Sequence, residues 1–260
     1  MSDFHWDYEA FLFLGVVLTL GAWLIAKIKK QAVNNSQRLQ TIRAVGSFFP
    51  LLLLILSVRS FAYEPFRIPS SSMMPTLYTG DFILVDKFSY GLKMPVFHNT
   101  LIETGKPKQG DVFVFRSVED PSVDVIKRVI AVPGDHVRYD VMNKQLYVND
   151  TAIAEQISDP YEGFIDDLNP IGLQQKTAQT GEQSHQVLYS KLIHRDYPFK
   201  DLVVPEGHYF GMGDNRDYSK DSRMFGLIPE KNIVGQAKLV WMHWRPDDFW
   251  QGLQRIGQFL

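Results

Sequence analysis

The chain has 260 residues, and its 27 Lys and Arg against 29 Asp and Glu give a formal net charge of −2. This balance, with 45% hydrophobic residues, fits one or two globular domains and argues against a disordered chain or a strongly basic nucleic-acid-binding protein. The chain has no cysteine, which excludes disulfides, thiolate metal sites and a cysteine nucleophile.

Two apolar stretches near the N-terminus predict membrane-spanning helices. The first covers about residues 8–27 and contains the uncharged run Phe11–Ala26, and the second covers about residues 47–65 with one basic residue, Arg59, near its end. A bilayer core of ~30 Å needs ~20 helical residues, so both stretches are long enough to cross it. Buried core helices are the alternative interpretation. We expect residues 1–66 to form a membrane anchor.

The charges around these stretches predict their orientation. The connecting loop, residues 28–46, has four basic residues and no acidic one, whereas residues 1–10 have three acidic residues and no basic one. Loops rich in Lys and Arg stay in the cytoplasm. The loop is therefore expected to be cytoplasmic, and the chain after Phe66 to lie on the other side of the membrane. The acidic leading region also argues against a cleavable signal peptide.

After Phe66 the sequence predicts a mainly β fold, because short runs of β-branched and aromatic residues alternate with Gly, Pro and Asp turns. The predicted strands are residues 82–85, 112–115, 123–132, 136–139, 145–148, 208–212 and 233–241. We expect an all-β domain formed by residues 67–140 and 203–260, with an inserted β-rich subdomain at residues 141–202. Residues 247–260 carry apolar side chains at helical spacing, which predicts a short packing helix.

Three consecutive serines, Ser70, Ser71 and Ser72, lie between two prolines just after the second apolar stretch. Such a segment is usually a turn or a linker, but a stiff loop can also present a nucleophilic hydroxyl. A serine needs a nearby base to react at neutral pH. None of the seven histidines has a local sequence that ties it to this loop, which leaves room for a lysine base.

Lys127 lies in one of the predicted strands, residues 123–132. Because side chains alternate across a strand, Lys127 shares one face with Val125 and Val129 and is the only charged residue on that face. Burial there would disfavour the charged form of the amine and lower its pKa. The alternative is a lysine on an edge strand, whose stem covers apolar surface while its ammonium group reaches water.

A third segment, residues 211–223, reads GMGDNRDYSKDSR and follows a predicted strand. It is rich in glycine, carboxylates and arginine, as are many solvated loops and calcium-binding loops. The spacing of Asp214, Asp217 and Asp221 does not match a calcium loop. The sequence gives no basis for a metal or any other cofactor.

Taken in this order, the segments resemble the type I signal peptidases (leader peptidases) of bacterial inner membranes, which are peptidases with a Ser/Lys dyad. The matching blocks are PSSSMMPTL, GDFILVDKFSYG, GDVFVF, IKRVIAVPGD and GMGDNRDYSKDSRMFGLIPE, and the two predicted spans also fit. Residues 141–202 show little match. Two departures are Ser71, where glycine is frequent in the family, and Tyr218 in the position before Ser219.

The resemblance implies a role for each matching residue. Ser72 is expected to be the nucleophile and Lys127 the general base, with Ser70 and the backbone N–H of Ser72 forming the oxyanion hole. The other matches are supporting groups and pocket residues: Ser219 orients the lysine, Asp221 with Arg223 and Asp214 with Arg128 form supporting pairs, and Phe66, Ile68, Pro69, Leu77 and Ile126 line shallow substrate pockets.

The implied enzyme is a membrane-bound serine endopeptidase, a hydrolase that removes N-terminal signal peptides from exported preproteins through an acyl-enzyme. Its expected location is the bacterial inner membrane, with the catalytic β domain on the periplasmic side. Its expected partners are preprotein signal peptides, the lipid bilayer and the protein-export machinery, and no nucleic acid. The alternatives are a self-cleaving Ser/Lys peptidase relative and a non-catalytic β scaffold tethered to the membrane.

Overall fold

The chain separates into two compact units in the computed structural model. The model describes residues 8–29, 37–61, 63–93, 100–102, 104–158, 161, 172–193, 195–199, 201–245 and 249–260. The first unit, here called the helical unit, comprises Met1–Glu64 and Gly91–Thr104. The second, here called the β unit, comprises Pro65–Tyr90 and Gly105–Leu260.

The helical unit contains α1 (Tyr8–Ile28), α3 (Gln37–Gly46) and α4 (Phe49–Phe61), with a short hairpin of β3 (Leu92–Lys93) and β4 (Thr100–Ile102). The helix α1 packs against both α3 and α4, and Leu12, Val16 and Leu56 are buried between them. Other apolar side chains of the same helices face outward, and Phe11 is 59% exposed. Two stretches, Phe11–Ile28 and Gln37–Ser57, are long and apolar enough to cross a membrane. A lipid environment would cover their outward apolar side chains.

The predicted basic loop, residues 28–46, is partly helical. Its second half forms α3, because no proline or glycine interrupts the chain between Gln37 and Val45. Gly46 ends this helix against α1, where an added Cβ would lie 2.6 Å from the backbone nitrogen of Trp23. The second predicted span is helical only as far as Phe61, because β1 (Tyr63–Arg67) begins two residues later.

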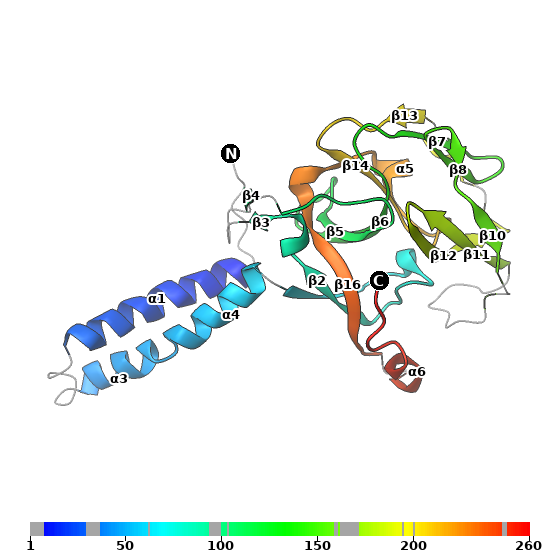
Figure 1. Cartoon of the computed structure of the whole chain (residues 1–260). Helices are drawn as coiled ribbons and strands as arrows, with labels where there is room; N and C mark the ends of the chain where they lie inside the picture. Colours follow the sequence, from blue (N-terminus) through cyan, green and yellow to red (C-terminus); the bar gives the residue numbers. More distant parts are fainter. Residues whose placement is uncertain are drawn as a thin grey trace. The chain divides into compact units, whose positions relative to one another are not determined.

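The main sheet of the β unit has seven strands in the order β1-β2-β16-β5-β6-β14-β15, and the neighbours from β2 to β15 pair antiparallel. In the ribbon of Figure 1, the long strand β16 runs between β2 and β5. The strands other than β1 are β2 (Asp81–Asp86), β5 (Val112–Arg116), β6 (Asp124–Ala131), β14 (His208–Met212), β15 (Ile228–Pro229) and β16 (Ile233–His243).

Two smaller sheets complete the β unit. One has the order β13-β7-β8-β9, formed by Asp201–Val203, His136–Asp140, Gln145–Val148 and Thr151–Ala152. The other has the order β10-β11-β12, formed by Glu155–Ile157, Leu173–Thr180 and Gln183–Ser190. All seven strands predicted from the sequence are present, with ends shifted by at most two residues. The short helical elements are η1 (Ser71–Met73), η2 (Phe88–Tyr90), α5 (Ser222–Phe225), η3 (Glu230–Asn232) and α6 (Phe249–Leu253).

The strand β6 is buried on both faces. Every residue from Ile126 to Ala131 is buried, because β5 and β14 flank the strand and separate apolar clusters pack on it. Val129 packs in a cluster with Phe113, whereas Ile130 packs in another with Val137. The alternative of an edge-strand lysine with a solvated ammonium group is therefore wrong.

The C-terminal segment is helical over a shorter stretch than the sequence predicted. Within its described part, residues 249–260, only Phe249–Leu253 forms a helix. Gly257 then adopts a φ of +89°, outside the helical region, and Phe259 forms a β-bridge with Leu239. The apolar side chains at helical spacing therefore divide between one helical turn and an extended end, a difference that spacing alone does not reveal.

Candidate active site

Ser72 lies on a short loop that the hydrophobic core holds in place. It is the middle residue of the single 3₁₀ turn η1, and the flanking Ser70 has an extended backbone. Met73 and Met74, which follow Ser72, are fully buried and anchor the loop to the interior. Ser72 itself is 9% exposed. This arrangement fixes the serine hydroxyl with little freedom, as a positioned nucleophile requires.

The structure brings Ser72 and Lys127 together across 55 residues of sequence. The Lys127 Nζ lies 2.9 Å from the Ser72 Oγ and 2.8 Å from the carbonyl oxygen of Ile126. Lys127 is 3% exposed, so water has almost no access to the amine. Neither hydrogen-bond partner of the amine is a carboxylate, which leaves the amine free to become neutral.

Burial lowers the pKa of Lys127 to about 8, since an ammonium group loses its hydration inside the protein. The carboxylates of Asp221 and Asp214 oppose this shift, and the guanidinium group of Arg223 adds to it. The resulting pKa of the amine is close to neutral pH, where a general base is most effective. The lysine predicted from strand alternation therefore has the electrostatics that its proposed chemistry needs.

Two residues that the sequence did not single out hold the Ser72 loop. The backbone N–H of Asn215 donates to the Ser72 carbonyl at 3.1 Å, and its side-chain Nδ2 donates to the Ser71 carbonyl at 3.1 Å. Gly213 lies so close that an added Cβ would be 2.4 Å from the Ser72 carbonyl oxygen and 2.3 Å from the Ser219 Oγ. Both residues belong to the GMGDNRD block, but the block does not reveal what they touch.

Two buried ion pairs support this arrangement, as the resemblance implied. The guanidinium group of Arg128 binds both carboxylate oxygens of Asp214, at 2.9 and 2.7 Å, and Thr76 donates to the same carboxylate. Although burial acts to raise the pKa of Asp214, Arg128 outweighs it and keeps the pKa below its usual value. Asp221 and Arg223 form a similar pair at 2.9 and 2.8 Å, and the pKa of Asp221 is lowered in the same way.

The carboxylate of Asp221 also connects its pair to the site. It accepts a hydrogen bond from the Gly213 backbone N–H at 3.1 Å and another from the Arg223 backbone N–H, which caps α5. The Asp221–Arg223 pair therefore holds the glycine that packs against Ser72. Removing one member of such a pair would leave an uncompensated buried charge, which is strongly destabilising.

Ser70 and Ser219, the two other serines predicted for the site, both lie near Ser72. Only Ser70 makes the contact expected of it. The Ser70 Oγ lies 3.4 Å from the Ser72 Oγ, which is suitable for a group that joins in stabilising an oxyanion. The expected hydrogen bond from Ser219 to Lys127 is not formed. The Ser219 Oγ is buried, has no partner among the described residues and lies against Gly213, while the amine donates to the Ile126 carbonyl instead.

Most of the predicted substrate-pocket residues meet in one apolar cluster. Ile68, Leu77 and Ile126 are buried members of it, and Phe66 packs against them partly exposed. Pro69 is exposed and lies next to this cluster in the chain. Because Ile68 and Leu77 are almost fully buried, they support the surface from beneath, and Phe66, Pro69 and the exposed fraction of Ile126 remain for substrate contact. Their role in specificity stays a prediction.

A serine hydroxyl hydrogen bonded to a buried amine on a β scaffold defines the class of serine hydrolases that use a lysine base. Comparison with known proteins identifies the family within this class. The chain matches the family described as Signal peptidase, peptidase S26, over residues 41–244. The chain belongs to this signal peptidase family, and the match favours an enzyme over a non-catalytic scaffold.

Individual relatives cover most of the chain. A signal peptidase I of Pseudomonas aeruginosa is 45% identical over 211 residues, which covers 77% of this chain and 72% of that protein. One of Pseudomonas fluorescens is 46% identical over 210 residues, covering 76% and 71%. One of Buchnera aphidicola is 37% identical over 260 residues and covers 83% of each chain. The chain is thus a serine endopeptidase of the signal peptidase I type.

Proposed function

We propose that Ser72 and Lys127 are the nucleophile and general base with which this chain removes signal peptides from preproteins. The hydrogen bond of 2.9 Å between Ser72 Oγ and the amine carries the proposal, because the amine is buried and no carboxylate of the described residues binds it. A lysine that is charged and paired at neutral pH could not accept the serine proton. Here the lowered pKa of Lys127 increases the neutral fraction of the amine, to about one chain in ten at pH 7.

The proposed reaction has two steps, acylation of Ser72 and hydrolysis of the acyl-enzyme. Neutral Lys127 takes the proton of Ser72, and the Ser72 Oγ forms a bond to the scissile carbonyl carbon. The oxyanion accepts hydrogen bonds from the Ser72 backbone N–H and the Ser70 hydroxyl. The ammonium group then protonates the leaving nitrogen, so the peptide bond breaks and leaves an ester on Ser72. Neutral again, Lys127 deprotonates a water that attacks this ester, and it returns the proton to Ser72.

The substrate in this proposal is the end of a signal peptide with small side chains around the scissile bond. The apolar cluster beneath Phe66 supports this choice, since Leu77 and Ile126 already fill the interior and leave little depth for a large side chain. A shallow surface accepts alanine-sized groups and excludes larger ones by steric clash.

We also propose that the helical unit anchors the enzyme in the bacterial inner membrane, with the β unit on the periplasmic side. The two candidate spans support the anchoring, and the basic residues Lys29 and Lys30 between them, with Arg38 and Arg43 in the first turns of the second, support the orientation. In this position the enzyme meets lipid, the membrane-held signal peptide and the export machinery that delivers the preprotein. Sharing one membrane raises the effective concentration of enzyme and substrate.

Preprotein cleavage in detergent by the full chain tests the proposal. Ser72→Ala and Lys127→Ala are both expected to abolish processing while the thermal unfolding transition stays cooperative. Ser122→Ala and Lys106→Ala are matched controls at exposed positions and should process as the unmodified chain does. Full activity of Lys127→Ala would show that another group is the base, and no cleavage by the unmodified chain would refute the function itself.

A further inference from the structure

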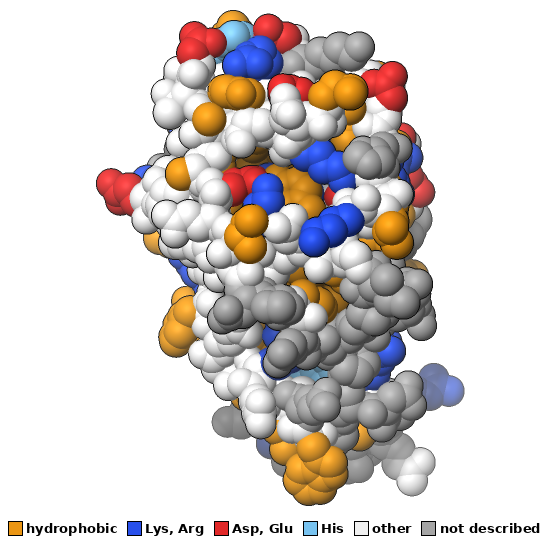
Figure 2. All heavy atoms as spheres, turned by 90° about the vertical axis from the view of Figure 1, so that its right-hand side faces the viewer, with side chains coloured by type: hydrophobic (Ala, Val, Ile, Leu, Met, Phe, Trp, Pro, Cys, Tyr) orange, Lys and Arg blue, Asp and Glu red, His pale blue; other side chains and the backbone are white. Residues whose placement is uncertain are grey.

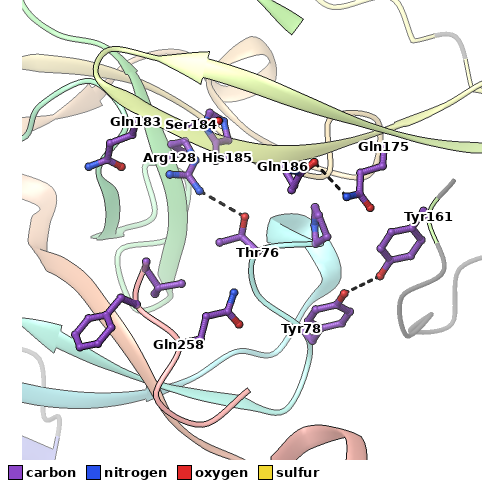
Figure 3. Close-up of a pocket in the computed structure, with 13 residues that line it drawn as sticks. Thr76, Tyr78, Arg128, Tyr161, Gln175, Gln183, Ser184, His185, Gln186 and Gln258 are labelled. Carbon is purple, nitrogen blue, oxygen red and sulfur yellow. Dashed lines mark hydrogen bonds between the residues drawn. The ribbon is translucent and has the colours of Figure 1, made fainter. Parts of the chain in front are cut away.

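A cavity of about 370 Å³ lies in the β unit beside the Ser72 loop. One wall is the start of β12, and the others are the chain just after Ser72, the C-terminal end and Tyr161, as the close-up of Figure 3 shows. Its lining residues include Pro75, Thr76, Arg128, Ser184, His185 and Gln186. The volume is within the range of sites that hold small molecules or a few residues of peptide.

The cavity wall includes a buried histidine whose ring nitrogens make no well-formed hydrogen bond among the described residues. His185 is 9% exposed, and neither ring nitrogen makes a well-formed hydrogen bond among the described residues, although Nε2 lies 3.8 Å from the Asp214 Oδ1 and the Gln183 backbone interacts with the ring. Burial lowers the pKa of His185 to about 3, so the neutral ring offers one N–H donor and one acceptor. Buried polar groups in folded proteins are nearly always satisfied. The weak contacts of these ring nitrogens leave hydrogen-bonding capacity on the cavity wall for a bound group.

The chemistry of the lining favours an uncharged ligand with both donors and acceptors. Glutamine amides and hydroxyl groups make up most of the polar lining. Among the described lining residues Arg128 is the one charged side chain, and the carboxylate of Asp214 already balances its charge. Figure 2 shows the molecule from the side on which β10–β12 lie in Figure 1, and there acidic and basic side chains are interspersed in its upper part. Peptide groups have the required combination of donor and acceptor without charge.

The edge of β12 beside the cavity is free to pair with another strand. The Leu188 N–H donates to the Asp214 carbonyl, and the Leu188 carbonyl accepts from the Arg216 N–H, both at 2.9 Å, so the main chain of Leu188 faces away from β11. In an antiparallel ladder this direction alternates, and the register of β11 with β12 has no shift. The main chains of Gln186 and Ser184 therefore also face away from β11, toward an edge without a described strand.

This edge is close to the nucleophile. Asn215, which bonds the Ser72 carbonyl, also forms a parallel β-bridge with Leu188, so β12 is linked to the Ser72 loop through a single intervening segment. The cavity residues Pro75 and Thr76 follow Ser72 by three and four positions, which is at most about 15 Å of extended chain. A substrate bound at Ser72 reaches the edge of β12 within a few residues.

We propose that the edge of β12 at Ser184 and Gln186, with the cavity that includes His185, binds an extended segment of the mature part of the preprotein by strand addition. Main-chain hydrogen bonds to the edge supply affinity, and the cavity takes alternate side chains or peptide groups. The mature part fits better than the signal peptide, because amide and hydroxyl side chains line much of the cavity, whereas a signal peptide carries an apolar stretch of ~7–15 residues before its cleavage site. This inference rests on the proposed function.

Disulfide trapping tests the location, because the chain contains no cysteine of its own. Ser184→Cys is combined with Ser72→Ala in the full chain, and preproteins carry a single cysteine at successive positions on either side of the scissile bond. We expect trapping with mature-part cysteines, strongest at every second position as in a strand. The control is Ser122→Cys, which is exposed on another loop. Trapping no greater than this control, or only with signal-peptide cysteines, would overturn the proposal.

A proline substitution tests the mode of binding. Ser184→Pro removes the outward N–H of an edge strand, where proline is tolerated, and Ser184→Ala keeps it. The measured quantity is the ratio of kcat/KM for a preprotein to kcat/KM for a short peptide that ends soon after the scissile bond. We expect this ratio to fall about threefold to tenfold in Ser184→Pro relative to Ser184→Ala, the loss of one or two hydrogen bonds. Equal ratios in the two variants would refute strand addition.

These outcomes are separable from the proposed function. Failure of the unmodified chain to cleave the short peptide would refute the proposed function, whereas an unchanged ratio with normal short-peptide cleavage would refute only the second site. If Ser184→Pro fails to show a cooperative thermal transition, the trapping measurement with Ser184→Cys decides the matter, because it does not change the backbone of β12.

Discussion

The burial of Lys127 makes a quantitative prediction about the pH dependence of cleavage. The pKa falls from 10.5 to about 8, a difference of 2.5 units, which corresponds to about 3 kcal/mol at ~1.4 kcal/mol per unit. At pH 7 about one Lys127 in ten is then neutral, whereas a lysine with the ordinary pKa would be neutral in about one chain in 3000. Burial thus raises the reactive fraction by roughly 300-fold at that pH.

The assay is kcat/KM for a short signal-peptide substrate in detergent from mildly acidic to alkaline pH. The base acts when it is unprotonated, so activity is lost as the pH falls through the lowered pKa. We expect kcat/KM to rise about tenfold per pH unit below pH ~8 and to level off above it. A rate that is flat across this range, or one that rises until pH ~10.5, would refute the assignment of a desolvated lysine base.

The same shift predicts an effect on stability with a definite sign. Between pH ~8 and ~10.5 the unfolded chain holds a proton on Lys127 that the folded chain has released, so the free energy of unfolding increases with pH in this interval. Below pH ~8 the buried amine is protonated in the folded chain, and its desolvation lowers the free energy of unfolding by the full amount of about 3 kcal/mol. Lys127→Met, which replaces the amine by an apolar group of similar length, should be the more stable protein at neutral pH in urea titrations and should lose this contribution to the pH dependence.

Three further substitutions have defined outcomes. Ser70→Ala should lower kcat by ~10²–10³-fold in the peptide assay if the hydroxyl stabilises the oxyanion, and an unchanged kcat would remove Ser70 from the site. Gly213→Ala places a Cβ 2.4 Å from the Ser72 carbonyl oxygen and should lower kcat/KM by about 100-fold, since this displaces the nucleophile. Arg128→Met leaves Asp214 buried without its partner and should reduce the free energy of unfolding in urea by about 3–5 kcal/mol. A loss of under about 1 kcal/mol would show that water reaches the carboxylate.

Strand alternation predicted much of the chemistry around Lys127. The sequence places the lysine among valines on one face of a strand, and the structure confirms its burial. Alternation alone could not exclude an edge strand, because the neighbours of β6 are β5 and β14, and β14 lies some 80 residues away in the sequence. The pairing with Ser72 likewise depends on tertiary folding, and only the family resemblance indicated it.

Residues 211–223 show which contacts the sequence pattern predicts and which it does not. The family resemblance of this block implied the Asp221–Arg223 pair, and the structure places the two side chains in contact. It did not identify Gly213, because the reason for that glycine is the approach of the Ser72 carbonyl from another part of the chain. The role expected of Ser219 stays a prediction, because its hydroxyl makes no hydrogen bond with Lys127 in this conformation.

The hairpin formed by β3 and β4 has a practical consequence for protein production. Residues Gly91–Thr104 group with the helical unit, although the chain enters and leaves them from the β unit. The two ends of this excursion lie together, since an added Cβ at Gly105 would be 2.6 Å from the carbonyl oxygen of Ser89. Removing the N-terminal helices alone would therefore leave residues 91–104 attached to the β unit without the helices with which they group. Joining Tyr90 to Gly105 through a short turn as well should yield a shortened version that dissolves without detergent and crystallises more readily.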